Sequence, residues 1–321
     1  MADINHLYAV THTDLDGIGS AAVLLRVYGR RPGRDATVAF TEPYELHEVL
    51  RGLGEYVERG DLLAITDLGL NEDTRGPVLD AIKSIVSRGA RVEWYDHHVW
   101  SEADVASLSR LGVEIYVDRT TCATGVVARY AAGGRGATDT FLAELVDAVC
   151  SADLWKWTNS LSAKLFRAAG SREASNEWRV KVLEKFLDGI LWDEELERRL
   201  EEYVNAELAN MREILKTVYT LEAGGVRIAV AYKENGPPAN SIVGALLTSR
   251  YKADIAAIVR PNGGISLRSR KVNVQRIAAK LGGGGHPRAA GAKIRIPLLV
   301  RLLGRLTPKI ITLYTAIIVA R

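Results

Sequence analysis

Two adjacent histidines behind an aspartate stand where a short strand is expected to end. The segment Trp94-Tyr95-Asp96-His97-His98 follows the strand-forming run Ala90–Glu93. Neutral imidazoles are good metal ligands, and a nearby carboxylate can orient their rings. A chance pair of surface histidines is the alternative, because a short motif carries a real false-positive risk. The other acidic segments of the chain decide between the two interpretations.

A second group of candidate ligands, His12, Asp14 and Asp16, follows the apolar run Leu7–Val10, which is predicted to be the first strand. If the backbone stays extended there, alternate side chains point to one side, so one imidazole and two carboxylates converge. The alternative is a turn in which the aspartates cap the next helix.

Two further aspartates, Asp67 and Asp153, complete the candidate set. Asp67 ends the strand predicted over Asp61–Thr66, and Asp153 follows a helix that is expected to end near Cys150. Taken alone, each has an ordinary explanation, as a turn cap or a loop acid. In a parallel sheet, however, sites assemble at the carboxyl ends of the strands, so these segments are expected to meet.

This set of donors points to hard or borderline divalent cations. Oxygen and imidazole ligands without thiolate suit Mn²⁺, Mg²⁺ or Co²⁺ better than structural zinc. The candidates exceed the needs of one ion. A site with two ions about 3.5–4 Å apart, which share a carboxylate and activate a water between them, accounts for all of them and serves in-line attack on phosphorus.

Alternating strands and helices are expected to position these residues. The pattern predicts an α/β protein: an N-terminal parallel sheet with covering helices, a helical connector, and a smaller C-terminal α/β domain. We place the first domain at residues 1–190, the connector at 191–220 and the second domain at 221–321. The connector is expected to contain one long amphipathic helix over 192–216, whose charges form a solvated face.

Taken together, the motifs resemble those of the DHH phosphoesterase family. Its four motifs are matched in order by His12–Gly17, Asp67, Asp96-His97-His98 and Asp153. Downstream, Ser266–Arg270 and the run Gly282–Gly291 resemble the signature of the DHHA1 domain. The pattern is most similar to the nanoRNase and RecJ-like branch, DHH subfamily 1. The resemblance covers nearly the whole chain, apart from the tail from about Pro297.

The resemblance implies a role for each site residue. One ion would be held by His12, Asp14 and Asp67, and the other by Asp16, Asp67, His97 and Asp153. His98 would face the scissile phosphate, and Asp96 would support the metal-binding histidines. The attacking group would be a metal-bridging hydroxide, so no protein nucleophile is needed.

Substrate contacts are expected in the C-terminal domain. Successive glycines let the backbone approach an anion and offer N–H donors, whereas a flexible linker is the alternative. In the DHH phosphoesterase family, which these motifs resemble, the segment binds the terminal phosphate or nucleotide of the substrate across an interdomain cleft. That likeness assigns substrate binding to Arg268, Gly283, Gly284, Gly285 and His286. Trp155 and Trp157 either stack on a base or pack at the domain boundary.

The family likeness implies a manganese-dependent phosphodiesterase or phosphatase that hydrolyses short oligonucleotides or small nucleotides. Three alternatives stay open: a RecJ-like single-strand exonuclease, a cyclic-dinucleotide phosphodiesterase, and a non-catalytic replication or repair scaffold. RecJ-like relatives usually carry further nucleic-acid-binding domains. Scaffold relatives have lost metal ligands, whereas this chain keeps every one. The sequence does not distinguish among four substrates: RNA, DNA, a cyclic dinucleotide and 3′-phosphoadenosine 5′-phosphate.

Composition fits a globular protein that acts on anionic substrates. The 321 residues suffice for two domains, and the net charge of +3 is weak evidence for a duplex-binding surface. The two cysteines form no CxxC pair, so no disulfide framework is expected and a reducing, cytoplasmic location is the default. A single glutamine and two methionines beside many Arg and Glu hint at a thermophile.

The apolar stretch Ile310–Ala320 is too short for a membrane span and is expected to be a buried strand or helix. No stable membrane association is expected. A homodimer is one option for the oligomeric state.

Overall fold

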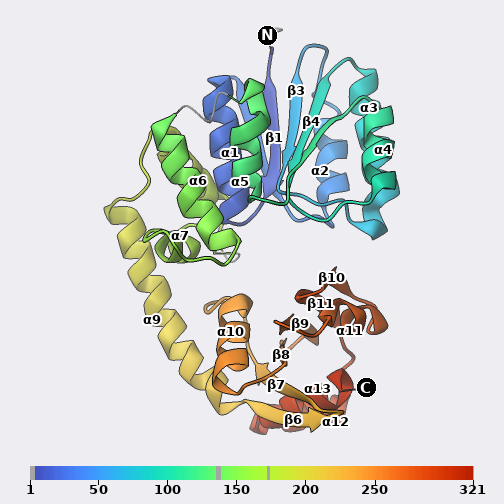
Figure 1. Ribbon diagram of the computed structural model, residues 1–321, viewed down its shortest axis with the longest axis vertical. Helices are drawn as coiled ribbons and strands as arrows, with labels where there is room; N and C mark the ends of the chain where they lie inside the picture. Colours follow the sequence, from blue (N-terminus) through green and yellow to red (C-terminus); the bar gives the residue numbers. More distant parts are fainter. Residues whose placement is uncertain (1–3, 135–138, 172–173, 321) are drawn as a thin grey trace. The chain divides into compact units, whose positions relative to one another are not determined.

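The chain divides into two compact units in the computed structural model: Met1–Leu200, called unit 1, and Glu201–Arg321, called unit 2. The structure describes residues 4–134, 139–171 and 174–320. Each unit has its own sheet and its own buried core (Figure 1).

Unit 1 contains a five-stranded parallel sheet with the order β2-β1-β3-β4-β5. Its strands are β1 (Leu7–His12), β2 (Ala36–Thr41), β3 (Leu62–Thr66), β4 (Arg91–Asp96) and β5 (Glu114–Val117). β3 is buried along its whole length, as expected of a parallel strand with both faces covered. The predicted parallel sheet is confirmed. Its order reverses between β1 and β3, where ligands bind outside the carboxyl ends of such strands.

Helices cover both faces of this sheet. They are α1 (Leu15–Tyr28), α2 (Leu46–Leu53), α3 (Arg75–Ser87), α4 (Glu102–Arg110), α5 (Ala123–Tyr130), α6 (Thr140–Asp153), α7 (Ser162–Ala168) and α8 (Asn176–Leu187). Leu63, Ile65 and Trp94 of the sheet face a core that contains residues of α2, α3 and α4. Leu62 and Ala64 face the opposite core, which contains residues of α1 and α5 (Figure 1).

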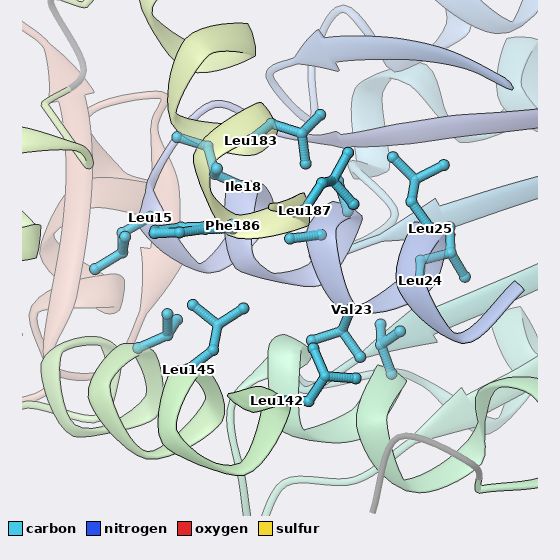
Figure 2. Packing of buried hydrophobic residues seen from close by; sticks show 14 of the residues in the cluster. Leu15, Ile18, Val23, Leu24, Leu25, Leu142, Leu145, Leu183, Phe186 and Leu187 are labelled. Carbon is cyan, nitrogen blue, oxygen red and sulfur yellow. The ribbon is translucent and has the colours of Figure 1, made fainter. Parts of the chain in front are cut away.

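Helix α1 is buried over most of its length because it lies between α6 and α8. Leu142 and Leu145 of α6 approach it from one side, and Leu183 and Phe186 of α8 approach it from the other (Figure 2). The N-cap residue is Asp14, whose side chain accepts a hydrogen bond from the Gly17 backbone N–H. This packing holds in place the first turn of α1, which belongs to the candidate site.

A single long helix, α9 (Glu194–Lys216), runs across the boundary of the two units, as the amphipathic pattern predicted. Unit 2 contains a six-stranded sheet with the order β10-β11-β9-β8-β7-β6, in which β7 and β8 pair in parallel and the other neighbours are antiparallel. Its strands are β6 (Tyr219–Ala223), β7 (Val226–Tyr232), β8 (Ile255–Val259), β9 (Gly264–Ser269), β10 (Gly284–His286) and β11 (Ala289–Lys293).

Helix α10 (Asn240–Arg250) covers one face of the unit 2 sheet, and α11 (Val274–Lys280) and α13 (Lys309–Val319) cover the other. The apolar stretch near the C-terminus, which was expected to be a strand or a helix, is therefore a helix. Helix α12 (Leu298–Leu306) precedes it and leaves Leu298, Leu299 and Leu306 exposed. Among the described residues, no helix is both long and apolar enough to cross a membrane.

The expectation that the chain holds no disulfide is wrong, because Cys122 and Cys150 are joined by one. The two cysteines lie 28 residues apart, a spacing that matches no motif. Cys122 caps α5 and Cys150 lies on α6, two helices that pack in the same core. Tertiary packing, rather than local spacing, creates the pair.

Candidate metal centre

Three sequence segments and the end of α6 bring six candidate ligands together in unit 1. His12, Asp14 and Asp67 form one group of donors, and Asp16, His97 and Asp153 form another; within each group the donor atoms lie within 4.8 Å of one another. Asp67, His97 and His98 form a third such group, which overlaps both. All six residues that the sequence nominated as ligands therefore belong to one continuous cluster.

Asp67 lies between the first two groups. Its Oδ2 is 3.5 Å from Nδ1 of His12, and its Oδ1 is 3.5 Å from Nε2 of His97. The residue is only 3% exposed and has the left-handed φ of +56°, which a non-glycine residue rarely adopts. Its backbone N–H donates to the Tyr95 carbonyl, which helps to hold this conformation at the end of β3. Backbone strain of this kind is typical of functional positions.

The His12 segment is not extended through Asp16, contrary to the condition that we set for convergence. Asp14 is the N-cap of α1 and Asp16 lies in its first turn. The helical turn still brings the donors together, because Nδ1 of His12 is 3.0 Å from Oδ2 of Asp14. Asp16 instead points toward His97, whose Nε2 lies 3.7 Å from Asp16 Oδ2 and 3.7 Å from Asp153 Oδ2. Asp14 thus caps α1, as the alternative supposed, and the same turn still brings the candidate ligands close together.

Asp16 is fixed by the beginning of α5. Its carboxylate accepts hydrogen bonds from the backbone N–H groups of Ala123 and Thr124, at 2.8 and 2.9 Å, and from the Thr124 hydroxyl at 2.6 Å. A helix N-terminus favours a negative charge placed against it. A carboxylate offers about four lone-pair positions, so these bonds leave room for an ion.

Asp96 contacts His98 rather than His97. Its Oδ1 lies 2.7 Å from His98 Nδ1, and its Oδ2 accepts a hydrogen bond from Trp100 Nε1 at 2.6 Å. We expected Asp96 to support both histidines, but its hydrogen bond is to His98. The fully buried Asp96 carboxylate thus engages the Nδ1 atom of His98.

The histidines and carboxylates shift one another's pKa values. Burial lowers the pKa of His97, but its hydrogen bond to Asp67 and the charges of Asp16 and Asp153 prevail and raise it to about 10. Burial also lowers the pKa of His98, and the hydrogen bond and charge of Asp96 raise it to about 9. Burial raises the pKa of Asp153 to about 7 against the opposing charge of His97. Without cations, the site holds protons in their place.

The donor set fits divalent cations. Asp67 Oδ2 is buried and has no hydrogen-bond partner among the described residues, although a buried carboxylate oxygen normally has one. An ion between His12 and Asp67 would satisfy it. The ligands are carboxylates and imidazoles, which suit Mn²⁺, Mg²⁺ or Co²⁺.

Two residues that sequence reasoning missed support His12 and its loop. Glu42 Oε2 lies 3.5 Å from His12 Nε2, and Glu42 Oε1 accepts a hydrogen bond from the Thr13 hydroxyl at 2.6 Å. Because Glu42 faces Nε2, the Nδ1 atom of His12 is directed toward Asp14 and Asp67. Arg179 of α8, 5% exposed, donates from Nε to the Thr13 carbonyl at 2.7 Å. Glu42 directly follows β2, so the strand-end rule would have found it; Arg179 carries no comparable signal.

In unit 2, the sheet register relates two of the expected substrate contacts. Ala289 of β11 pairs with Arg268 of β9 on one side and with His286 of β10 on the other. Directly paired residues of antiparallel strands share a face of the sheet, so Arg268 and His286 lie on the same face. The Arg268 side chain passes over Gly244 of α10, where an added Cβ would lie 2.7 Å from Arg268 Cγ. Gly244 thus leaves room for this side chain.

The glycine run has a packing role that we did not anticipate. A Cβ on Gly283 would lie 2.1 Å from the Gly291 carbonyl oxygen, and one on Gly285 would lie 2.7 Å from Ala290 Cα. Both glycines therefore permit β10 to pair closely with β11, so neither the linker alternative nor anion contact is needed to explain them. Gly284 differs, because a Cβ there would meet nothing within 4 Å.

The two tryptophans after Asp153 pack against each other. Their ring centroids are 4.7 Å apart, and both contact Phe166 edge-on. Trp157 packs against the core of unit 1, whereas Trp155 is 40% exposed. Packing therefore explains the position of Trp157, whereas part of the Trp155 ring is exposed to solvent.

Comparison with known proteins agrees with these motifs. The DHHA1 domain family matches residues 225–306. Oligoribonuclease NrnB of Bacillus subtilis (strain 168) is 26% identical over 319 residues, which cover 90% of this chain and 72% of that protein.

Two solved structures share the fold. Exonuclease RecJ bound to manganese superposes with a TM-score of 0.57 at 19% identity and covers 97% of this chain and 90% of its own. The pGpG-specific phosphodiesterase PggH from Vibrio cholerae superposes with a TM-score of 0.56 at 16% identity and covers 95% of this chain and 98% of its own. The chain thus shares the fold of these two structures, and its residues 225–306 match the DHHA1 domain family.

Proposed function

We propose that this protein is a two-cation phosphodiesterase or phosphatase that hydrolyses short oligonucleotides or small nucleotides. The observation that carries the proposal is the position of Asp67, whose two carboxylate oxygens face His12 and His97 separately. A single carboxylate that faces two groups of ligands is the arrangement that two neighbouring ions require.

His12, Asp14 and Asp67 would hold one ion, and Asp16, Asp67, His97 and Asp153 the other. Divalent ions bound there would lower the pKa of a water and offset the charge of the phosphate oxygens. Mn²⁺ is our first choice of metal, with Mg²⁺ and Co²⁺ as the alternatives.

His98 is proposed to bind the scissile phosphate. Burial lowers the pKa of His98, but the hydrogen bond and charge of Asp96 raise it to about 9 in the metal-free chain, which favours the charged ring. Asp96 holds that ring from the side of Nδ1. A fixed cation that faces the developing charge of the transition state stabilises that state more than it stabilises the substrate.

The substrate class is supported by the names of the relatives. One is an oligoribonuclease and another is a pGpG-specific phosphodiesterase, and both act on short nucleotide chains. For the present chain we propose Arg268 and His286 as contacts for a second part of the substrate. Trp155 is a further candidate, since its ring is partly exposed. A cytoplasmic location and a homodimer stay predictions.

One observation favours the RecJ-like alternative. After Asp254 the chain contains no Asp or Glu, while it contains thirteen Lys and Arg residues. The net charge of +3 conceals this concentration. A basic surface attracts phosphate backbones irrespective of their sequence, and a long single strand would profit most.

A time course on 5′-labelled RNA and DNA oligomers of graded length, with Mn²⁺, distinguishes the two. We expect kcat/KM to be far higher for two- to five-nucleotide substrates than for a strand of about twenty, which exceeds the footprint of a typical single-strand-binding module. Rapid, processive digestion of the long strand would favour the exonuclease. The Asp67→Asn variant is assayed beside the wild type. Activity that both samples show comes from a contaminating nuclease, and activity that only the wild type shows belongs to this protein.

A further inference from the structure

The disulfide lies between two of the candidate metal ligands. Cys122 is the N-cap residue of α5, and the next two backbone N–H groups are those that donate to Asp16. Cys150 lies on α6, three residues before Asp153, which ends that helix. Residues three apart on a helix are neighbours on its surface. The S–S bond therefore joins the element that fixes Asp16 to the element that carries Asp153.

The separation of these ligands depends on how α5 and α6 are held together. Asp16 and Asp153 approach the same atom, Nε2 of His97, and both lie near Asp67. One imidazolium between them offsets only part of the charge of three carboxylates, so part of their mutual repulsion remains. A covalent link between the start of α5 and the end of α6 opposes a separation of the two elements.

The beginning of α5 is buried and consists of small residues. Cys122, Ala123 and Thr124 are fully buried, and the larger apolar side chains of Val126 and Val127 lie a turn further on. The disulfide adds a covalent contact at the residue where α5 begins, beside the two N–H groups that donate to Asp16.

We propose that the Cys122–Cys150 disulfide is a positioning link, which holds Asp16, His97 and Asp153 at ion-binding separation before an ion arrives. The proposal rests on the proposed function in that these residues bind a divalent cation. The other group, His12, Asp14 and Asp67, comes from β1, the start of α1 and the end of β3, elements that the link does not join. The link therefore acts mainly on one ion site, because Asp67 is the ligand through which the two sites are connected. Disulfides persist inside hyperthermophiles, which fits the scarcity of Gln and Met.

Reduction by a dithiol opens the link. The S–S bond breaks through a mixed disulfide, two electrons and two protons pass to Cys122 and Cys150, and the dithiol leaves as a cyclic disulfide. Because Cys122 is buried, the full chain is reduced in mild denaturant, refolded, and freed of dithiol under anaerobic conditions, since dithiols bind metal ions. An oxidised sample taken through the same steps is the reference.

Isothermal titration with Mn²⁺ then compares the two samples. We expect two sites in the oxidised chain, and after reduction a loss of affinity of about 10- to 100-fold, mainly at one site, which is the size seen when a supporting contact of a metal ligand is removed. The double variant Cys122→Ala/Cys150→Ala should behave like the reduced chain. Val127→Ala is the matched control, because it opens the same core, keeps the disulfide and should leave both affinities within about twofold.

A second readout needs no metal. Amide hydrogen exchange of Ala123 and Thr124 in the metal-free chain should become at least about tenfold faster after reduction, because exchange reports local opening. Equal weakening of both Mn²⁺ sites, equal weakening by Val127→Ala, or unchanged affinity despite faster exchange would each overturn the positioning role. Failure of the proposed function looks different: the oxidised chain would then bind no Mn²⁺ at all, while the exchange rates would still report the effect of the link on α5.

Discussion

The two units of this protein differ in the sign of their locally concentrated charge. Unit 1 buries acid: Asp16, Asp67 and Asp96 are at most 3% exposed and are grouped with histidines. Unit 2 carries no acidic residue after Asp254 and concentrates basic ones there. Buried carboxylates in this number are tolerated only with compensating positive charge. Unit 1 is therefore built to receive cations, and the basic part of unit 2 is suited to anions.

The comparison also explains the mild net charge of +3. Opposite local charges cancel in the sum, although each acts locally on whatever binds beside it. Under the proposed function, unit 1 supplies cations for the bond that is cleaved, and the basic part of unit 2 supplies donors for other phosphates. The predictions below test each half of this division.

The largest effect is expected for Asp67→Asn. The change is nearly isosteric, but it removes the charge shared by both groups of ligands, so kcat should fall by more than about 100-fold and both ions should bind weakly. Activity assays and metal content by mass spectrometry measure this. Asp73→Asn, an exposed acid of the following segment, is the control and should change neither. Retention of more than about a tenth of kcat would refute the two-ion assignment.

The two histidines should separate metal binding from phosphate binding. His97→Ala should lose both Mn²⁺ and rate, because His97 lies among Asp16, Asp67 and Asp153. His98→Ala should keep Mn²⁺ but lose about 10²- to 10³-fold in kcat, the usual cost of removing one donor to the transition state. Equal loss of Mn²⁺ from the two variants would contradict this division of roles.

The proposed substrate contact in unit 2 is tested by His286→Ala. For a dinucleotide, kcat/KM should fall about 10- to 100-fold, the value of one hydrogen bond to a charged group. The generic diester bis-p-nitrophenyl phosphate, which needs only the cation site, should be cleaved at the normal rate. Lys280→Ala removes an exposed positive charge from the neighbouring helix and serves as the control. If both substrates lose equally, His286 acts on folding and is not a substrate contact.

The smallest effect is expected in the pH dependence of Mn²⁺ binding. The metal-free site holds protons, since the pKa of His97 is about 10 and that of Asp153 is about 7. An ion must displace more protons as the pH falls, because burial also raises the pKa of Asp16, and the charge of Asp14 outweighs burial to raise the pKa of His12. Affinity should therefore rise with pH, and more steeply below pH 7. Calorimetry in two buffers of different ionisation enthalpy counts the released protons; an affinity independent of pH would contradict these shifts.

Much of unit 1 could be predicted because its ligands obey a local rule. Asp67 and Asp96 end apolar strands, so their position in the chain already places them at one edge of a parallel sheet. The rule does not specify backbone detail, which is why the sequence left open whether the segment from His12 to Asp16 is extended or caps a helix; the chain is helical from Leu15 onward.

Features created by tertiary packing could not be predicted from local patterns. Arg179 reaches the Thr13 carbonyl from a helix that lies 166 residues further along the chain. The disulfide depends on how α5 and α6 pack, and no spacing rule covers it. In unit 2 the glycine run was interpreted as an approach for an anion, whereas Gly283 and Gly285 are required by strand pairing that only the register reveals.

The central claim, that Asp67 joins two ion sites, can be tested most directly by anomalous diffraction from crystals grown with Mn²⁺. The account predicts two anomalous peaks about 3.5–4 Å apart. One should lie against His12 and Asp14, the other against Asp16, His97 and Asp153, with an oxygen of Asp67 on each. A single peak, or two peaks of which only one touches Asp67, would contradict it.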